Sequence, residues 1–140
     1  MYRYRDHSGG VTQFSLDRLD LPLSKIGRPI EVKGYTYWGR YDTDHAAVMV
    51  KGTRGTARFE GFSWGYSGEG PHGLRTLLMR LGLTKEAAEL VAFHGPSWTT
   101  YPLAVHWRVM FEFVTDANGK VTNKPVEIRI CSGLGKNQAA

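Results

Sequence analysis

Three glycines between residues 68 and 73 have the spacing of a loop that can hold a phosphate group. Gly68, Gly70 and Gly73 form the pattern G-x-G-x-x-G, and a helix-forming stretch follows them. In such a loop the unpaired backbone N–H groups at the start of the helix bind phosphate oxygens. A dinucleotide-binding fold also needs a strand after the helix, and Pro71 removes one backbone donor here. The pattern therefore predicts a helix end that accepts an anion rather than a dinucleotide-binding fold.

We expect the side chains around this turn to form a ligand site. His72 and Arg75 lie in the first turns of the helix, where they can donate hydrogen bonds to an anion. Against this, the Glu69 carboxylate could occupy the helix end, and the glycines could serve only to turn a strand into a helix. The sequence leaves both alternatives open. The predicted ligand-binding residues are Tyr66, Ser67, Gly68, Gly70, His72, Gly73 and Arg75, with Tyr37 lining one side.

The segment Trp64–Leu74, WGYSGEGPHGL, carries a resemblance to other proteins. It is similar to a W-G-Y-x-G-x-G-P-x-x-L pattern found in small uncharacterised proteins of phages and actinobacteria. The resemblance is confined to this segment, and those proteins have no activity that could be carried over. It implies only an accessory role in a phage or another mobile element.

A second set of polar residues could carry acid–base or metal chemistry. Asp42, Asp44 and His45 lie in the sequence DTDH and would form such a constellation if His94 or His106 folded beside them. The simpler interpretation is a loop whose aspartates hydrogen-bond to the turn. No two histidines stand at metal-ligand spacing, and the chain has one cysteine. We therefore predict no catalytic residue, no metal site and no cofactor, and a hydrolase-like enzyme using Asp44 and His45 is the weakest alternative.

Aromatic residues indicate two further surfaces that could bind a partner. One strand carries Tyr35, Tyr37, Trp38 and Tyr41 among basic residues. Exposed aromatic rings of this kind stack nucleobases, whereas buried ones belong to the core. Trp98 and Tyr101 lie in the loop 94–102, and an aromatic loop suits contact with another protein. A protein–protein interaction or inhibitor module acting through this loop is therefore the main alternative to ligand binding.

Composition and charge limit the class of protein and of partner. The chain has 140 residues, 17 glycines and one cysteine, and its net charge is +5. The positive charge favours an anionic partner, but the basic residues are scattered, so nucleic acid is less favoured than a nucleotide. No apolar stretch has the length of a membrane span, and the first residues are polar. We expect a basic cytoplasmic protein without membrane contact, and homo-oligomerisation stays open.

The periodicity of the apolar residues predicts the elements that position these side chains. An N-terminal hairpin is expected at 2–5 and 11–16, followed by an irregular stretch at 17–29. Further strands are predicted at 30–41, 45–51, 56–64, 105–114 and 126–130, and helices at about 71–81 and 85–93. Gly34 marks a bulge position in its strand. His106 and Arg108 are expected on the water-facing side of the strand 105–114.

This order of elements predicts an α+β fold. The sheet is mostly antiparallel with about six or seven strands, and the two helices cover one of its faces. We expect residues 1–134 to form a single domain and residues 135–140 to form a flexible tail. Within this fold, the sequence favours a small non-enzymatic binding protein. Its expected ligand is a nucleotide or another phosphate-bearing molecule held near the glycine-rich turn.

Overall fold

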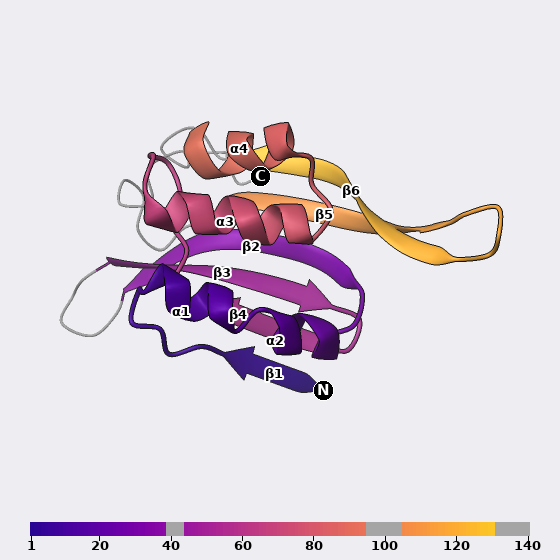
Figure 1. The fold of residues 1–140 in the computed structure, drawn as a ribbon, viewed down its shortest axis with the longest axis horizontal. Coiled ribbons are helices and arrows are strands. Elements are labelled where there is room, and N and C mark those ends of the chain that lie inside the picture. Colours follow the sequence, from indigo (N-terminus) through magenta and orange to yellow (C-terminus); the bar gives the residue numbers. More distant parts are fainter. Residues whose placement is uncertain (39–43, 95–104, 131–140) are drawn as a thin grey trace.

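The computed structural model describes residues 1–38, 44–94 and 105–130, which form a sheet covered by helices (Figure 1). The elements in chain order are β1 (Tyr2–Arg5), α1 (Thr12–Asp17), α2 (Asp20–Lys25), β2 (Pro29–Trp38), β3 (Asp44–Gly52), β4 (Gly55–Phe59), α3 (Glu69–Arg80), α4 (Lys85–His94), β5 (Val105–Thr115) and β6 (Val121–Ile130). The strands form one sheet in the order β1-β4-β3-β2-β5-β6. Every pair is antiparallel except β1 and β4. The predicted α+β class is confirmed, with four short helices in the described residues instead of two.

The predicted N-terminal hairpin is wrong, because only its first strand, β1, is present. Residues 12–17 form α1 rather than a strand, and α2 lies within the stretch expected to be irregular. Strand β1 pairs in parallel with the distant β4, so the chain between β1 and β2 has to cross over, and short helices fill that crossover. The buried face of α1 consists of Thr12 and Ser15, whose spacing is helical but whose side chains are polar. A search for apolar periodicity therefore could not detect this helix.

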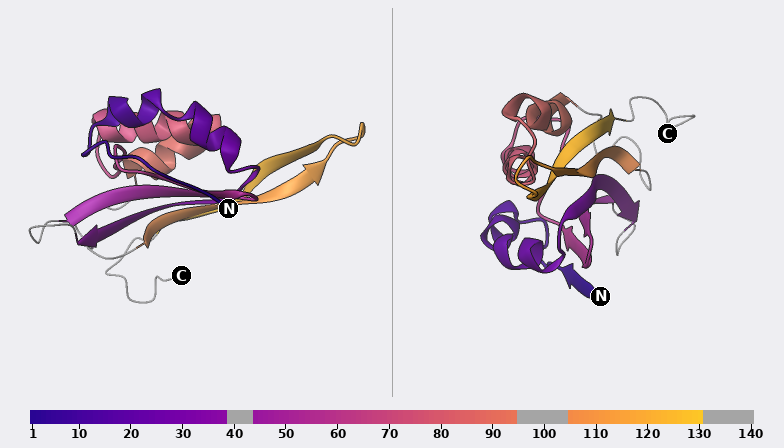
Figure 2. Two further views of the ribbon diagram at one scale, coloured as in Figure 1. Left: turned by 90° about the horizontal axis from the view of Figure 1, so that it is seen from below. Right: turned by 90° about the vertical axis from the view of Figure 1, so that its right-hand side faces the viewer.

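The helices pack on one face of the sheet, and the core lies between the two layers (Figure 2). The predicted stripe on α3 is confirmed, because Leu74, Leu77 and Leu78 are fully buried. Helix α4 buries Ala88, Val91 and Ala92 in the same core. The burial of apolar surface in this layer supplies most of the stability of the fold, at roughly 25 cal/mol per Å².

A bulge in β5 overturns the predicted orientation of His106. Trp107 pairs with Gly34 and Val105 pairs with Tyr35, so His106 is the extra residue on β5. The bulge turns His106 and Trp107 to the same side, and both are buried. A Cβ atom at Gly34 would lie 2.3 Å from the Trp107 Nε1 atom, which explains why a glycine stands opposite the bulge. The bulge thus lies opposite Gly34, the residue predicted to mark a bulge.

The opposite face of the sheet, which we call the outer face, carries mainly polar and aromatic side chains. On β2, Val32 and Thr36 are buried toward the helices, so the alternate residues Tyr35 and Tyr37 lie on the outer face. None of the described helices lies over this face (Figure 2). The outer face is therefore a second surface of the fold, distinct from the helix layer.

Some expectations concern residues outside the described ranges. They include the aromatic loop with Trp98 and Tyr101, the residues Tyr41 and Asp42, and the tail 135–140. None of the described helices is long and apolar enough to cross a membrane.

Candidate functional site

The glycine-rich turn is a packing contact between the start of α3 and the preceding chain. Gly68 precedes the helix in an extended conformation with φ −171°, and Glu69 is the first helical residue. A Cβ atom at Gly70 would lie 2.0 Å from Ser63 Oγ, and one at Gly73 would lie 2.4 Å from Thr12 Cγ2. These two glycines let the helix approach its neighbours closely. The spacing that suggests a phosphate loop also follows from this packing.

The polar side chains predicted to hold an anion are engaged in contacts between α3 and α4. Arg75 Nη1 lies 2.8 Å from Glu89 Oε2, and the guanidinium group lies 5.7 Å from the centre of the Phe93 ring. The His72 ring packs on the same phenylalanine at 4.9 Å. Glu69 is exposed in the first turn, and its negative charge faces the positive end of the helix dipole. An anion at this end would have to compete with both carboxylates.

The remaining predicted residues divide between two places. Tyr66 and Ser67 are exposed beside the start of α3, and the Tyr66 hydroxyl lies 2.9 Å from Ser63 Oγ. Tyr37 lies on the outer face of the sheet and hydrogen-bonds to Glu60. The structure therefore separates Tyr37 from the other predicted ligand-binding residues, whose role stays a prediction.

A compact group of aromatic and charged side chains surrounds Tyr37 on the outer face. The centres of the His45 and Tyr37 rings lie 5.4 Å apart, and the ring planes differ by 25°, so the two rings are stacked. The centre of the Tyr35 ring, two residues away on β2, lies 6.2 Å from that of Tyr37. The guanidinium carbon of Arg58, on β4, lies 4.6 Å from the centre of the Tyr37 ring. Strands β2 and β3 therefore form one continuous aromatic strip, consisting of Tyr35, Tyr37 and His45, and Arg58 of β4 lies against it.

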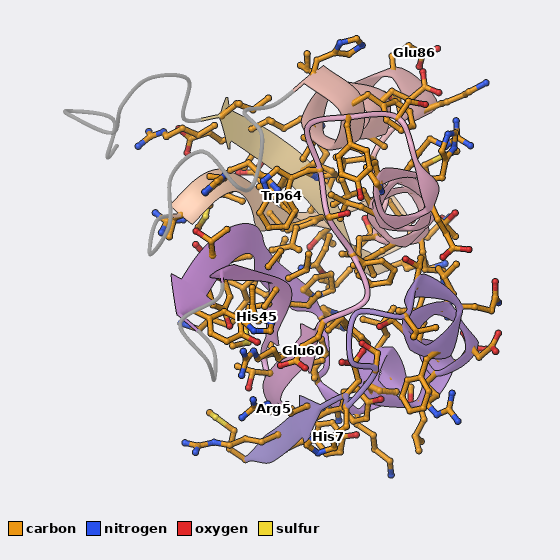
Figure 3. All side chains as sticks on the ribbon, turned by 90° about the vertical axis from the view of Figure 1, so that its left-hand side faces the viewer. Arg5, His7, His45, Glu60, Trp64 and Glu86 are labelled. Carbon is orange, nitrogen blue, oxygen red and sulfur yellow. The ribbon has the colours of Figure 1, made fainter. Side chains whose placement is uncertain are left out.

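Two hydrogen bonds and one ion pair converge on one oxygen atom beside this strip. Glu60 Oε2 lies 3.1 Å from Tyr37 Oη, 3.2 Å from Arg58 Nη2 and 3.4 Å from Arg5 Nη2. We call these four residues, Arg5, Tyr37, Arg58 and Glu60, the Glu60 cluster. Figure 3 shows Arg5, Glu60 and His45 in the same part of the molecule. The cluster joins β1, β2 and the end of β4, which are distant in sequence.

A buried aspartate holds the backbone on which this cluster is built. Asp6 is 1% exposed, and its Oδ1 atom accepts a hydrogen bond of 2.9 Å from the backbone N–H of Glu60. Its other carboxyl oxygen accepts a hydrogen bond from the Ser15 hydroxyl. The same hydroxyl oxygen accepts the backbone N–H of Gly61 at 3.0 Å. The end of β1, helix α1 and the end of β4 are thus tied together at one point.

The outer face is basic and its tyrosines are neutral at physiological pH. Its cations include Arg3, Arg5, Lys33, Lys51, Arg58, Arg108, Lys124 and Arg129, and its carboxylates include Glu31, Glu60, Glu112 and Glu127. Burial raises the pKa of Tyr35 and Tyr37 above the ordinary value, and the positive charge of Arg58 only partly offsets this. Both hydroxyls therefore keep their protons and remain hydrogen-bond donors.

Of the predicted acid–base constellation, the structure describes the side chains of the histidines, whereas Asp42 lies outside the described residues. His45 lies on the outer face, whereas His106 is buried among the helix-side residues, where Trp64 Nε1 donates to its Nδ1 atom at 3.1 Å. His94 is exposed at the end of α4. No group of three histidine, cysteine, aspartate or glutamate side chains in the described ranges could hold a metal ion.

Sequence reasoning identified Tyr37 but missed Arg5, Arg58 and Glu60. In the sequence TARFE, the alternation of Ala57 and Phe59 with charged residues does place Arg58 and Glu60 on the face away from the core. That signal could have marked them as surface residues. It could not have shown that Arg5 joins them, because this depends on the parallel pairing of β1 with β4. Comparison of the chain with family models, curated proteins and solved structures found no match.

Proposed function

We propose that this protein binds single-stranded nucleic acid without catalysis, and that the outer face of the sheet is its binding surface. The observation that carries the proposal is the aromatic strip of Tyr35, Tyr37 and His45, flanked by the cations of the outer face. Aromatic rings stack nucleobases of any sequence, and arginine and lysine neutralise the phosphates between them. The overall charge of +5 agrees with an anionic partner.

The spread of the charges favours a strand over a single nucleotide. Basic side chains occur from β1 at one edge of the sheet to β6 at the other. Six strands with a spacing of about 4.8 Å make this face roughly 24 Å wide, which is more than one nucleotide can contact. A strand can place its bases on the aromatic strip and its phosphates on the flanking cations. The proposal keeps the phosphate-bearing nucleotide expected from the sequence but moves it from the glycine-rich turn to the sheet.

The stacking part of the site has limited capacity. Tyr35 and Tyr37 are half-buried, and Tyr37 already contacts His45 and Arg58, so only the exposed His45 ring and the edges of the tyrosines are open to a base. Base–aromatic stacking contributes about 1 to 3 kcal/mol per base. With one or two stacked bases, most of the affinity has to come from phosphate contacts. We therefore expect strong dependence on salt and weak dependence on sequence.

The test is fluorescence anisotropy of a labelled oligothymidylate, titrated with protein at several salt concentrations. The double substitution Lys33→Gln and Lys51→Gln should weaken binding and reduce the slope of log K against log salt by about 0.7 for each lost contact. The matched control, Lys25→Gln and Lys85→Gln, removes the same charge from helices α2 and α4. An equal loss of affinity in the two double variants would show that the outer face is not the binding surface. Absence of binding by the unmodified protein at low salt would refute the proposal.

A further inference from the structure

The Glu60 cluster has the geometry of an anion site whose occupant belongs to the protein. Arg5 and the Tyr37 hydroxyl donate hydrogen bonds to the single oxygen Glu60 Oε2 at 3.4 and 3.1 Å, and Arg58 forms an ion pair with the same oxygen at 3.2 Å. Carboxylate and phosphate oxygens accept the same charge-assisted hydrogen bonds from arginine. We propose that this cluster is a phosphate subsite of the outer face, and that the Glu60 side chain occupies it until a phosphate group displaces it. The inference rests on the proposed function, because it assigns one phosphate of the bound strand to these donors.

The position of Arg58 does not depend on Glu60. The Arg58 side chain is 15% exposed and lies against the Tyr37 ring, so packing fixes its position. Its Nε atom is buried without a hydrogen-bond partner among the described residues, so Glu60 does not satisfy the whole guanidinium group. Arg5 is 57% exposed and can follow a ligand. Removal of the carboxylate would leave a basic site that is already formed.

Glu60 itself can leave without disturbing the sheet. Its backbone N–H is bonded to Asp6, which fixes the main chain at the end of β4. Within the described part of the chain, its side chain is held only by Arg5, Tyr37 and Arg58. Rotation about the side-chain bonds therefore moves the carboxylate away while the strand keeps its position. The exchange of one acceptor for another leaves no donor unpaired, which limits its cost.

Two other carboxylates of the outer face, Glu31 and Glu127, make different contacts. Glu31 Oε2 pairs with Arg108 alone at 2.6 Å, and Glu127 pairs with Arg129, two residues away on the same strand, at 2.7 Å. Neither gathers donors from separate strands in the described residues. Glu31 therefore provides a matched control, since its replacement removes the same charge from the same face without opening the cluster.

The experiment compares the variants E60Q and E31Q in the anisotropy titration at low salt. E60Q should bind the oligothymidylate at least about threefold more tightly than E31Q, because the phosphate no longer competes with a carboxylate for its donors. Equal affinity of the two variants, or weaker binding by E60Q, would overturn the inference. The proposed function would then still stand if the substitution of Lys33 and Lys51 weakens binding. Failure of every variant to bind would refute both.

Two further arms make the result specific. The advantage of E60Q should shrink in the presence of Tyr37→Phe, which removes one donor; an unchanged advantage in this double-mutant cycle would contradict the cluster as the site. Oligothymidylates with a 5′-hydroxyl and with a 5′-phosphate identify the source of the phosphate. An equal advantage for both supports a phosphodiester of the strand, and an advantage confined to the second supports a terminal phosphate. Thermal melting of E60Q and E31Q verifies that both are folded.

Discussion

The start of α3 and the Glu60 cluster contain the same kinds of residues in opposite arrangements. At the start of α3, Arg75 pairs with one carboxylate and His72 packs on one ring, so each group has its own partner. In the Glu60 cluster, side chains from three segments of the chain contact one carboxylate oxygen. The comparison teaches that convergence of donors, rather than the spacing of glycines, distinguishes the better candidate for binding an anion.

The largest effect is expected from the residue that supports the cluster. Asp6→Ala removes a buried carboxylate that accepts two hydrogen bonds, one of them buried and one partly buried, and should lower the free energy of unfolding by roughly 3 kcal/mol. Chemical denaturation measures this loss. The same substitution should weaken oligothymidylate binding at temperatures where the protein stays folded, because Glu60 and Arg5 lose their relative position. The exposed Asp17→Ala serves as the control, and a loss of similar size there would contradict the role of Asp6.

Substitution of a packing glycine should affect stability without affecting binding. Gly70→Ala forces a Cβ atom toward Ser63 Oγ and should cost about 1 to 3 kcal/mol of unfolding free energy. Adding Ser63→Ala should recover part of this loss, since it removes the clashing oxygen. Denaturation and anisotropy are measured on the same variants. Loss of oligothymidylate affinity in folded Gly70→Ala would show that the glycine-rich turn is a ligand site after all.

Removal of the ion pair between α3 and α4 should change the free energy of unfolding less. Its effect on affinity should show whether the start of α3 or the outer face binds the strand. Arg75→Ala breaks a partly exposed pair and should reduce stability by only about 0.5 kcal/mol. If the outer face binds the strand, affinity stays unchanged in Arg75→Ala and in Glu89→Ala. If the start of α3 binds the anion, Arg75→Ala weakens binding and Glu89→Ala strengthens it. A loss of stability would weaken binding in both variants, so opposite changes in affinity cannot result from unfolding.

The smallest effect is expected at alkaline pH, on the tyrosines of the outer face. The raised pKa of Tyr35 and Tyr37 means that the folded protein holds these protons more tightly than the unfolded chain. Their contribution to stability is complete below the ordinary tyrosine pKa of about 10 and is lost as the pH rises through the raised value. Stability should therefore fall less steeply in this pH range for the variant with Tyr35→Phe and Tyr37→Phe. Parallel curves would show that other groups cause the decline.

Elements whose pattern depends on residues close in sequence could be predicted from the sequence alone. The leucine stripe of α3 and the hairpin of β3 and β4 follow from local periodicity and turn composition, and both are present. Helix α1 could not be predicted in this way, because it buries Thr12 and Ser15 rather than apolar residues. Its stability comes from hydrogen bonds such as that from Thr12 Oγ1 to the Gly61 carbonyl oxygen at 2.6 Å.

The candidate site was less accessible to prediction than the fold. Tyr37 attracts notice as an aromatic residue in a polar strand, but arginine and glutamate on an exposed strand face usually indicate only a solvated surface. Their significance depends on which strands are neighbours. The pairing of β1 with β4 joins residues more than fifty positions apart, as the separation of 55 between Arg5 and Glu60 shows. No local pattern encodes that pairing.

The parallel pairing of β1 and β4 also determines when the Glu60 cluster becomes complete. Strands β2, β3 and β4 are joined by short connections and form contacts close in sequence, whereas β1 has to close a long loop before it docks. Contacts of this kind form late in folding and, at the edge of a sheet, open early. Because Arg5 is carried by β1, only the fully docked chain has both arginines beside Glu60. Occupancy of the site by a phosphate is therefore coupled to the order of the N-terminal strand, which makes that short edge strand part of the recognition surface rather than a terminal extension.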